Sequence, residues 1–257
     1  MAQEKVTYIF WTGGWDSTYR MVELSRMDIT VQPIYCVHEA VPSLHIELER
    51  LDKILQMLKA KKETKASFLP VKQVKVTQYA ADAEIENSWK KLRNTIRIGS
   101  QYIFLAKVAK QFPGIELGIE RPNGELSGCF ATFEHFGKLV EENGNWKLDP
   151  ARTDPACLAV FGQMTFPICH ITEVEMVENI KKWGYQDVMQ WIWFCRDPLI
   201  KNKEFVACGV CRPCQQKMES NMEFLLPLKA QKRYHLWKKL SSFVGKTIAR
   251  KVVRLIS

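Results

Sequence analysis

The sequence predicts an α/β fold, in which a parallel sheet carries helices on both faces. Short runs rich in β-branched and aromatic residues alternate along the chain with longer segments whose apolar residues recur every three or four positions. Strands that alternate with helices pair in parallel, because each helix returns the chain to the edge of the sheet where the previous strand began. A hydrophobic content of 46% over 257 residues suits one large core, with or without a small appended unit, and excludes a disordered chain.

The first strand is expected over residues 6–11, a run of β-branched and aromatic residues that breaks at Gly13 and Gly14. A helix is expected over residues 19–27, and the residues that can cap its start are Asp16, Ser17 and Thr18. A strand, a glycine turn and a helix start in succession commonly bind phosphate, because glycines admit the anion and free N–H groups point at it. An ordinary strand-to-helix turn is the alternative.

The next elements follow the same alternation. Residues 31–37 suit a second strand, although Pro33 weakens its pairing. A helix over residues 43–58 is expected because leucines fall on one of its faces, at positions Leu44, Leu48, Leu51, Leu55 and Leu58. A third strand is expected in two parts, 68–71 and 74–76, followed by helices over 80–93 and 100–112 and by a fourth strand over 115–120.

Residues 121–150 interrupt this pattern with turn signals such as Asn143-Gly144, and we expect an excursion there over the active-site end, a lid or substrate loop. A fifth strand is expected over 164–168. Ligands of parallel sheets gather at the carboxyl ends of the strands. The residues expected to meet there are 12–16, 37–39 and Glu120.

Two further helices are expected before the cysteine-rich region. Thr172 and Glu175 have the spacing of a capping box, and Gly184 ends the helix that it opens. A short aromatic helix is expected next, around Trp191, Trp193 and Phe194.

The net charge of +9 belongs to the end of the chain. Of 37 basic and 28 acidic residues, nine basic and no acidic ones follow Leu228, so the rest of the chain is balanced. The body therefore does not have the composition of a nucleic-acid-coating surface. The first residues lack the basic-then-apolar order of a secretory signal, and prolines interrupt the uncharged stretch 155–172, so we expect a cytoplasmic protein without a membrane span.

A late group of cysteines predicts a zinc site. Cys195 precedes Cys208, Cys211 and Cys214, and two residues separate each of the last three. Four thiolates match the tetrahedral preference of zinc, and a Cys-x-x-Cys turn lets backbone N–H groups stabilise the sulfur charge. A redox role is the alternative. The other cysteines are expected to be small buried hydrophobes, and they are Cys36, Cys129, Cys157 and Cys169.

The glycine turn resembles a known signature. Thr12-Gly13-Gly14-Trp15-Asp16-Ser17 is similar to the Ser-Gly-Gly-x-Asp-Ser motif of the PP-loop ATP pyrophosphatases, with Thr in the first place. The resemblance implies a Rossmann-like, adenine nucleotide alpha hydrolase-like fold whose loop binds the pyrophosphate end of ATP. The residues that it assigns to ATP are Thr12, Gly13, Gly14, Trp15, Asp16, Ser17 and Thr18. It makes Asp16 and Ser17 the catalytic candidates and implies Mg²⁺ near Asp16.

The turn and the cysteines together resemble the 7-cyano-7-deazaguanine synthase (QueC) family. The run Cys208-Gly209-Val210-Cys211-Arg212-Pro213-Cys214 is similar to that family's zinc knuckle, and either 35–38 or 45–49 is similar to its Tyr-Gly-Gln-Arg-His…Glu-Leu-Glu stretch. The family's substrate loop, Gly-Tyr-Pro-Asp-Cys-Arg, corresponds here to 127–133, which lacks the carboxylate and the guanidinium. We therefore expect a changed acceptor.

This resemblance implies an adenylating, pyrophosphate-releasing ligase. A carboxylate, for example on a 7-deazaguanine-type base as in queuosine biosynthesis, attacks the α-phosphorus of ATP, and ammonia or an amine then displaces AMP to give an amide or a nitrile. Zinc is structural in this scheme, because four thiolates leave no open coordination position. His38, near a strand end, is a candidate general base, with a polar rim residue as the alternative.

Three parts are expected: an ATP-binding domain over 1–190, a zinc subdomain over 191–228 and a basic amphipathic helical tail over 229–257, which Gly245 divides. Such a tail lies on RNA or on an anionic membrane, or it packs on the body or on a second subunit of a homodimer. The alternatives to a QueC-like ligase are a PP-loop enzyme that modifies tRNA, a related protein acting on another small molecule or a protein terminus, and a non-catalytic zinc module.

Overall fold

The computed structural model describes residues 6–37, 43–124, 126, 128–142, 144–201 and 204–255. These residues form two compact units, one from residues 6–37 and 53–191 and the other from residues 43–52 and 192–255. The helix α2 (Leu44–Ala60) contributes to both.

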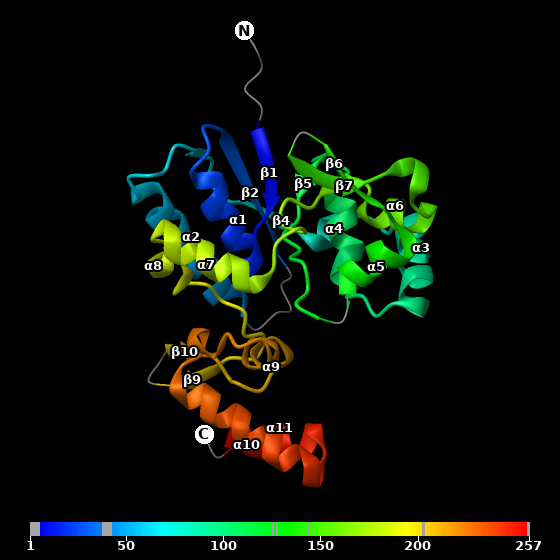
Figure 1. Cartoon of the computed structure of the whole chain (residues 1–257). Coiled ribbons are helices and arrows are strands. Elements are labelled where there is room, and N and C mark those ends of the chain that lie inside the picture. The colour runs from blue at the N-terminus through cyan, green and yellow to red at the C-terminus, as the bar shows by residue number, and fades with distance from the viewer. Residues whose placement is uncertain are drawn as a thin grey trace. The chain divides into compact units, whose positions relative to one another are not determined.

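A parallel sheet forms the centre of the first unit (Figure 1). Its six strands have the order β3-β2-β1-β5-β8, with β4 also paired to β2, and every pair is parallel. The strands are β1 (Val6–Phe10), β2 (Thr30–Val37), β3 (Ser67–Phe68), β4 (Lys72–Lys75), β5 (Ile115–Glu116) and β8 (Met164–Thr165). The prediction of an α/β fold with a parallel sheet is confirmed.

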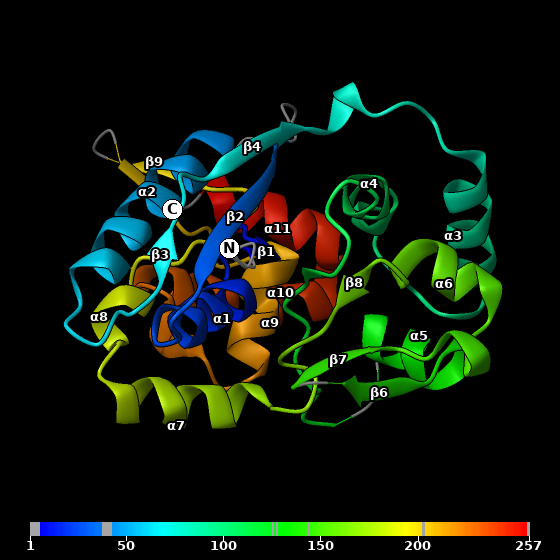
Figure 2. The same cartoon turned by 90° about the horizontal axis from the view of Figure 1, so that it is seen from above.

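Helices cover this sheet on both sides. Figure 2 shows α1 and α7 on one side of the sheet and α4 on the other. The helices of this unit are α1 (Trp15–Ser25), α3 (Ala83–Thr95), α4 (Gln101–Ala109), α5 (Gly128–Phe136), α6 (Pro155–Phe161), α7 (Glu173–Trp183) and α8 (Gln186–Met189), with 3₁₀ turns at Val76–Gln78 and Pro150–Arg152. The capping box of Thr172 and Glu175 is present at the start of α7, and Gly184 ends that helix at a φ of 77°.

The strand order reverses direction at β1. The chain first moves outward from β1 to β2 and β3, and then continues on the other side of β1 with β5 and β8. In an open parallel sheet, such a reversal leaves a crevice at the carboxyl ends of the two strands that flank it. The glycine turn after β1 and the segment after β5 therefore lie at the position where this kind of fold binds ligands.

Pro33 divides the neighbouring edge of the sheet. It lies inside β2 and pairs with Ile9 of β1, but it has no N–H to donate. On its other side, β3 pairs with the start of β2 and β4 with its end, so residues 69–71 opposite Pro33 belong to no strand. The Gln32 side chain spans this break, donating to Pro70 O at 2.7 Å. The pairing weakness expected from Pro33 thus appears as a split third strand.

The segment 121–150 differs from the irregular excursion that the turn signals suggested. It contains α5 and an antiparallel hairpin of β6 (Leu139–Glu142) and β7 (Asn145–Leu148). The apolar face of α5, with Cys129 and Phe133, is buried in the main core, as is Leu148 of β7. The segment therefore has regular structure with one face packed on the core, whereas residues such as Glu134, Glu141 and Glu142 are exposed.

The second unit combines the cysteine region with the basic end of the chain. It contains the hairpin β9 (Leu199–Lys201) and β10 (Glu204–Val206), the helices α9 (Arg212–Glu219), α10 (Leu228–Val244) and α11 (Lys246–Leu255), and a 3₁₀ turn at Glu223–Leu225. Gly245, at a φ of 78°, divides the tail as expected. The four cysteines, Tyr234 and Trp237 of α10, and Ala249 and Val253 of α11 share one core.

The aromatic stretch 191–194 is not helical, contrary to the sequence expectation. The preceding helix α8 ends at Met189, and the indole N–H of Trp193 donates to Cys195 O at 2.9 Å. Among the residues described, no helix has both the length and the apolar composition needed to span a membrane.

Candidate functional site

The turn between β1 and α1 is held by its own side chains. The backbone N–H of Trp11 donates to Ile34 O at 2.9 Å, which continues the sheet one residue past β1. The Trp11 indole donates to the Thr18 hydroxyl at 3.1 Å, and the N–H of Thr12 reaches the Ser17 hydroxyl at 3.5 Å. The β1 end of the turn is therefore fixed to the first turn of α1.

Several backbone donors of this turn have no acceptor among the residues that the structure describes. Gly13 has a φ of 72°, a conformation that glycine adopts without strain. The N–H of Thr18 donates to Gly14 O at 3.0 Å, the first bond of the helix. In the part of the chain that the structure describes, the N–H groups of Gly13, Gly14 and Ser17 donate no hydrogen bond. These donors lie at the positive end of the α1 dipole, an arrangement that favours an anion.

The side chains of the turn differ in accessibility. Thr12 is exposed and Asp16 is half-buried, whereas Trp15 and Thr18 are buried. The Thr18 hydroxyl accepts from Trp11, and the Ser17 hydroxyl accepts from Thr12, so both stabilise the turn itself. Of the side chains predicted to bind ATP, Thr12 and Asp16 are thus the ones that reach solvent from this turn.

Gly118 brings the segment after β5 against the start of α1. A Cβ atom at Gly118 would lie 3.0 Å from Ser17 N and 3.2 Å from Asp16 C. These are backbone atoms and not flexible side-chain ends, so a larger residue would displace the helix start. Glycine is required here for close packing of two backbones at the sheet reversal.

Three carboxylates meet beside the turn. One oxygen each from Asp16, Glu120 and Glu173 lies within 4.8 Å of the others, and all three side chains are half-buried. They follow the three adjacent strands β1, β5 and β8, respectively. The N–H of Arg121 donates to Ile171 O at 2.7 Å, which joins the segments carrying Glu120 and Glu173. Carboxylate oxygens are the ligands that Mg²⁺ prefers, so this group fits a divalent cation.

Sequence reasoning identified two of these carboxylates. Asp16 was the predicted neighbour of Mg²⁺, and Glu120 was expected at a strand end. Glu173 was missed. Its position in the first turn of the helix that follows the fifth strand was a sequence signal that it lies near the strand ends. The candidate base His38 and the neighbouring Glu39 lie outside the residues that the structure describes, as does Ser127 of the predicted substrate segment.

A buried ion pair connects α1 with β5 beneath the site. Arg20 donates through Nε and Nη2 to the two carboxylate oxygens of Glu116, each at 2.8 Å, and through Nη1 to Glu23 at 3.0 Å. Arg20 is 9% exposed and Glu116 is 3% exposed. Burial by itself lowers the pKa of Arg20, but the hydrogen bonds to Glu116 and Glu23 and the negative charges of these two carboxylates together outweigh it, so the pKa is raised. The fork geometry fixes α1 relative to β5.

The four cysteines of the second unit converge as predicted. Their sulfur atoms lie within 4.8 Å of one another, and all four residues are buried. Cys211 Sγ is 3.4 Å from Cys214 Sγ and 3.9 Å from Cys195 Sγ. Tetrahedral Zn–S bonds of about 2.3 Å place sulfurs about 3.8 Å apart, so the spacing suits a metal such as zinc.

Backbone donors surround these sulfurs. The N–H groups of Val210 and Cys211 donate to Cys208 Sγ at 3.4 and 3.2 Å, and that of Cys208 donates to Cys195 Sγ at 3.3 Å. Hydrogen bonding with the neighbouring thiols, first with Cys195, lowers the pKa of Cys208. N–H donors of this kind stabilise thiolates bound to a metal.

Gly209 and Arg233 attach the cysteine turn to α10. Gly209 has a φ of 79°, and a Cβ atom there would lie 2.1 Å from Ala230 O. The Arg233 guanidinium, buried beside the turn, donates to Cys208 O at 2.8 Å and to Ala207 O at 2.7 Å. This positive charge lies next to four sulfurs, which carry negative charge when they bind a metal.

The remaining cysteines behave as buried hydrophobes. Cys129, Cys157 and Cys169 are buried and Cys36 is half-buried. Burial raises the pKa of Cys36, Cys157 and Cys169 to about 12, so these thiols stay protonated at neutral pH.

No protein-family model matches this chain, and no curated protein matches it. The geometry of the turn, of the carboxylates and of the cysteines is therefore the basis for a functional proposal.

Proposed function

We propose that this protein is an ATP-dependent ligase that adenylates a carboxylate and releases pyrophosphate, with a fold of the PP-loop type. The observation that carries the proposal is the turn after β1, whose N–H groups at Gly13, Gly14 and Ser17 have no acceptor among the described residues. It lies at the reversal of the strand order, beside three carboxylates. A triphosphate would accept hydrogen bonds from these N–H groups, and its divalent cation would bind the three carboxylates.

The residues of the site have distinct roles in this proposal. The turn amides and the start of α1 bind the β- and γ-phosphates and stabilise the charge that develops on departing pyrophosphate. Asp16, Glu120 and Glu173 hold Mg²⁺, which neutralises negative charge on the phosphates when it is bound. Ser17 keeps the turn closed through Thr12. The acceptor carboxylate attacks the α-phosphorus, and an amine or ammonia then displaces AMP from the acyl-adenylate.

The four-cysteine group is proposed to bind zinc with a structural role. All four sulfurs point into one buried site, so no coordination position is left for a substrate. Zinc in this place fixes the cysteine turn against α10 through Gly209 and Arg233.

The test is pyrophosphate exchange. Labelled pyrophosphate enters ATP only when a carboxylate has been adenylated reversibly, so a panel of carboxylated nucleobases, small metabolites and peptides reports both activity and acceptor class. We expect exchange with at least one member, and we expect Asp16→Asn or Glu120→Gln to reduce it about 100-fold or more. Asp28→Asn, which removes an exposed carboxylate of the same unit, is the matched control. Exchange that is absent across the panel, or equal in Asp16→Asn, contradicts the proposal.

A further inference from the structure

The exposed side of α10 combines lysines with large apolar side chains. Lys229, Lys232, Leu236, Lys239 and Phe243 recur at intervals of three and four residues and are all exposed. We call them the exposed stripe. The opposite side of the helix, with Tyr234 and Trp237, is buried in the core of the second unit. The stripe covers about 21 Å of helix, at about 1.5 Å per residue.

Exposed apolar residues concentrate in this region. Among the residues described, ten large hydrophobic side chains are exposed, and five of them belong to α10 and α11. They are Leu228 at 72%, Leu236 at 38%, Phe243 at 78%, Val244 at 42% and Ile248 at 57% exposed. Three of these lie within six residues around Gly245, where the two helices join. Such a concentration on a soluble surface marks an interaction site.

The charge of this region has one sign. No acidic residue follows Leu228, whereas nine basic residues do. Arg250 and Arg254 pair with Asp197 of the same unit, but the lysines of the exposed stripe form no ion pair with the residues that the structure describes. An anionic partner is therefore the complementary one.

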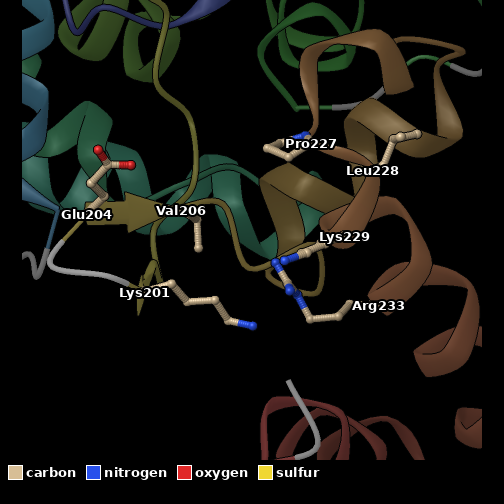
Figure 3. A pocket seen from close by; sticks show the side chains of 7 residues that line it. All are labelled: Lys201, Glu204, Val206, Pro227, Leu228, Lys229 and Arg233. Carbon is tan, nitrogen blue, oxygen red and sulfur yellow. The ribbon is translucent and has the colours of Figure 1, made fainter.

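A hollow at the start of α10 is lined by positively charged side chains. It has a volume of about 520 Å³ and is lined by Lys201 and Val206 of the β hairpin and by Leu228, Lys229 and Arg233 of α10, among others. Figure 3 shows the nitrogen atoms of Lys201, Lys229 and Arg233 directed toward one space, with the Glu204 carboxylate turned away from it. The ammonium groups of Lys201 and Lys229 suit a phosphate group, whereas the Arg233 guanidinium already donates to Ala207 O and Cys208 O.

We propose that α10 and the start of α11 form a docking surface for an anionic lipid bilayer. Phe243, Val244 and Ile248 enter the headgroup layer, the lysines of the exposed stripe contact lipid phosphates, and the hollow accepts one of them. The exposed aliphatic residues favour a lipid over RNA, because aliphatic side chains do not stack on bases, whereas they gain free energy on leaving water. This proposal is independent of the ligase activity.

Vesicle co-sedimentation of the full chain tests it. Phosphatidylcholine vesicles are compared with vesicles in which about one-third of the lipid is phosphatidylserine. We expect binding to the anionic vesicles only, weakened about tenfold or more by Lys229→Gln with Lys232→Gln and Lys239→Gln, because each basic residue near the surface contributes about fivefold. Leu236→Ser with Phe243→Ser is expected to weaken it by at least about tenfold. All five side chains are exposed, so the melting temperature serves as a check that the variants fold.

Matched controls make these changes elsewhere on the molecule. Lys59→Gln with Lys62→Gln and Lys65→Gln removes three exposed lysines of the first unit, and Met27→Ser with Val174→Ser removes two exposed apolar side chains. Neither control should alter vesicle binding. The proposal is overturned if anionic vesicles do not bind the protein, if the controls weaken binding as much as the stripe variants, or if tRNA binds the chain and the vesicles do not.

Discussion

Gly118 and Gly209 each allow two backbones to approach closely beside a candidate site. Gly118 lies against the start of α1, and Gly209 lies against Ala230 of α10. The reasons differ, because Gly118 is constrained by space, whereas Gly209 is constrained both by space and by its positive φ. Alanine substitutions can separate these two effects.

Gly118→Ala is expected to lower the free energy of unfolding by about 1–3 kcal/mol, because its Cβ must push the backbone of Asp16 and Ser17 aside. It should also weaken ATP binding, since the displaced residues carry the proposed phosphate donors. Gly124→Ala adds the same methyl group to open space and is the control. Urea unfolding of the two variants gives the comparison. Equal stabilities would show that the contact at Gly118 relaxes without cost.

Gly209→Ala is expected to cost about 3 kcal/mol or more and to reduce the zinc content of the protein, because its Cβ would overlap Ala230 O. Gly184 has nearly the same φ, 77°, but nothing lies within 4 Å of its Cβ position. Gly184→Ala therefore measures the backbone strain alone, about 1–2 kcal/mol. If both variants lose the same stability and keep the metal, the close approach to α10 has no energetic role.

Residue patterns identified the turn, the cysteines and two of the three carboxylates. Asp16 was found because it belongs to a local motif, and the cysteines were found because their spacing matches zinc coordination. Gly118 escaped prediction because its role depends on contact with Asp16 and Ser17, more than a hundred positions away, and Glu173 because it meets Asp16 and Glu120 only in the folded chain. The Thr18 hydroxyl, a candidate phosphate contact, also accepts from the Trp11 indole, a partner that the motif does not reveal.

At the scale of elements, α1 and β5 are connected by the Arg20–Glu116 pair. Glu116→Ala leaves a buried guanidinium whose one acidic partner among the described residues is Glu23, and we expect the free energy of unfolding to fall by about 3–5 kcal/mol. Lys110→Ala, which breaks an exposed pair with Asp82, should cost less than about 1 kcal/mol. Thermal unfolding measures both. A loss in Glu116→Ala no larger than in Lys110→Ala would show that the buried pair does not fix α1.

Helices and strands were predicted best where the pattern of apolar and capping residues within the segment itself determines the structure. The alternation of strands and helices indicated a parallel sheet, and the capping box located the start of α7. The helix α5 was missed because glycine and asparagine turn signals on both sides dominated the interpretation of 121–150. The helix expected over 191–194 was wrong for a different reason. The composition of this run allows a helix, but the Trp193 indole donates to the backbone carbonyl of Cys195 instead.

At the scale of the whole molecule, two centres lie in separate compact units, the glycine turn in one and the four cysteines in the other. The cysteines share their core with α10 and α11, so metal should stabilise that whole unit. The basic end of the chain is thus a packed pair of helices, an arrangement that its helical spacing alone left open.

Metal analysis of the purified chain is expected to find about one zinc per molecule. Cys214→Ser should lose this zinc and lower the melting temperature of the second unit, because three thiolates bind zinc more weakly than four and the folding free energy that the metal supplies is lost with it. Cys169→Ala, which changes a buried cysteine of the first unit, should keep the metal. Zinc retained in Cys214→Ser, or absent from the unaltered protein, contradicts a structural zinc site.

Binding of ATP with Mg²⁺, measured by isothermal titration calorimetry, tests the central claim that the turn after β1 binds a nucleotide triphosphate. Gly14 has an extended backbone, and a Cβ there would meet only the Thr12 hydroxyl at 3.4 Å, so Gly14→Glu should fold while placing a negative charge among the phosphate donors. We expect saturable binding to the unaltered chain, at least about tenfold weaker binding to Gly14→Glu, and unchanged binding to Gly124→Glu. No saturable binding to the unaltered chain, or equal binding to Gly14→Glu, would contradict the account.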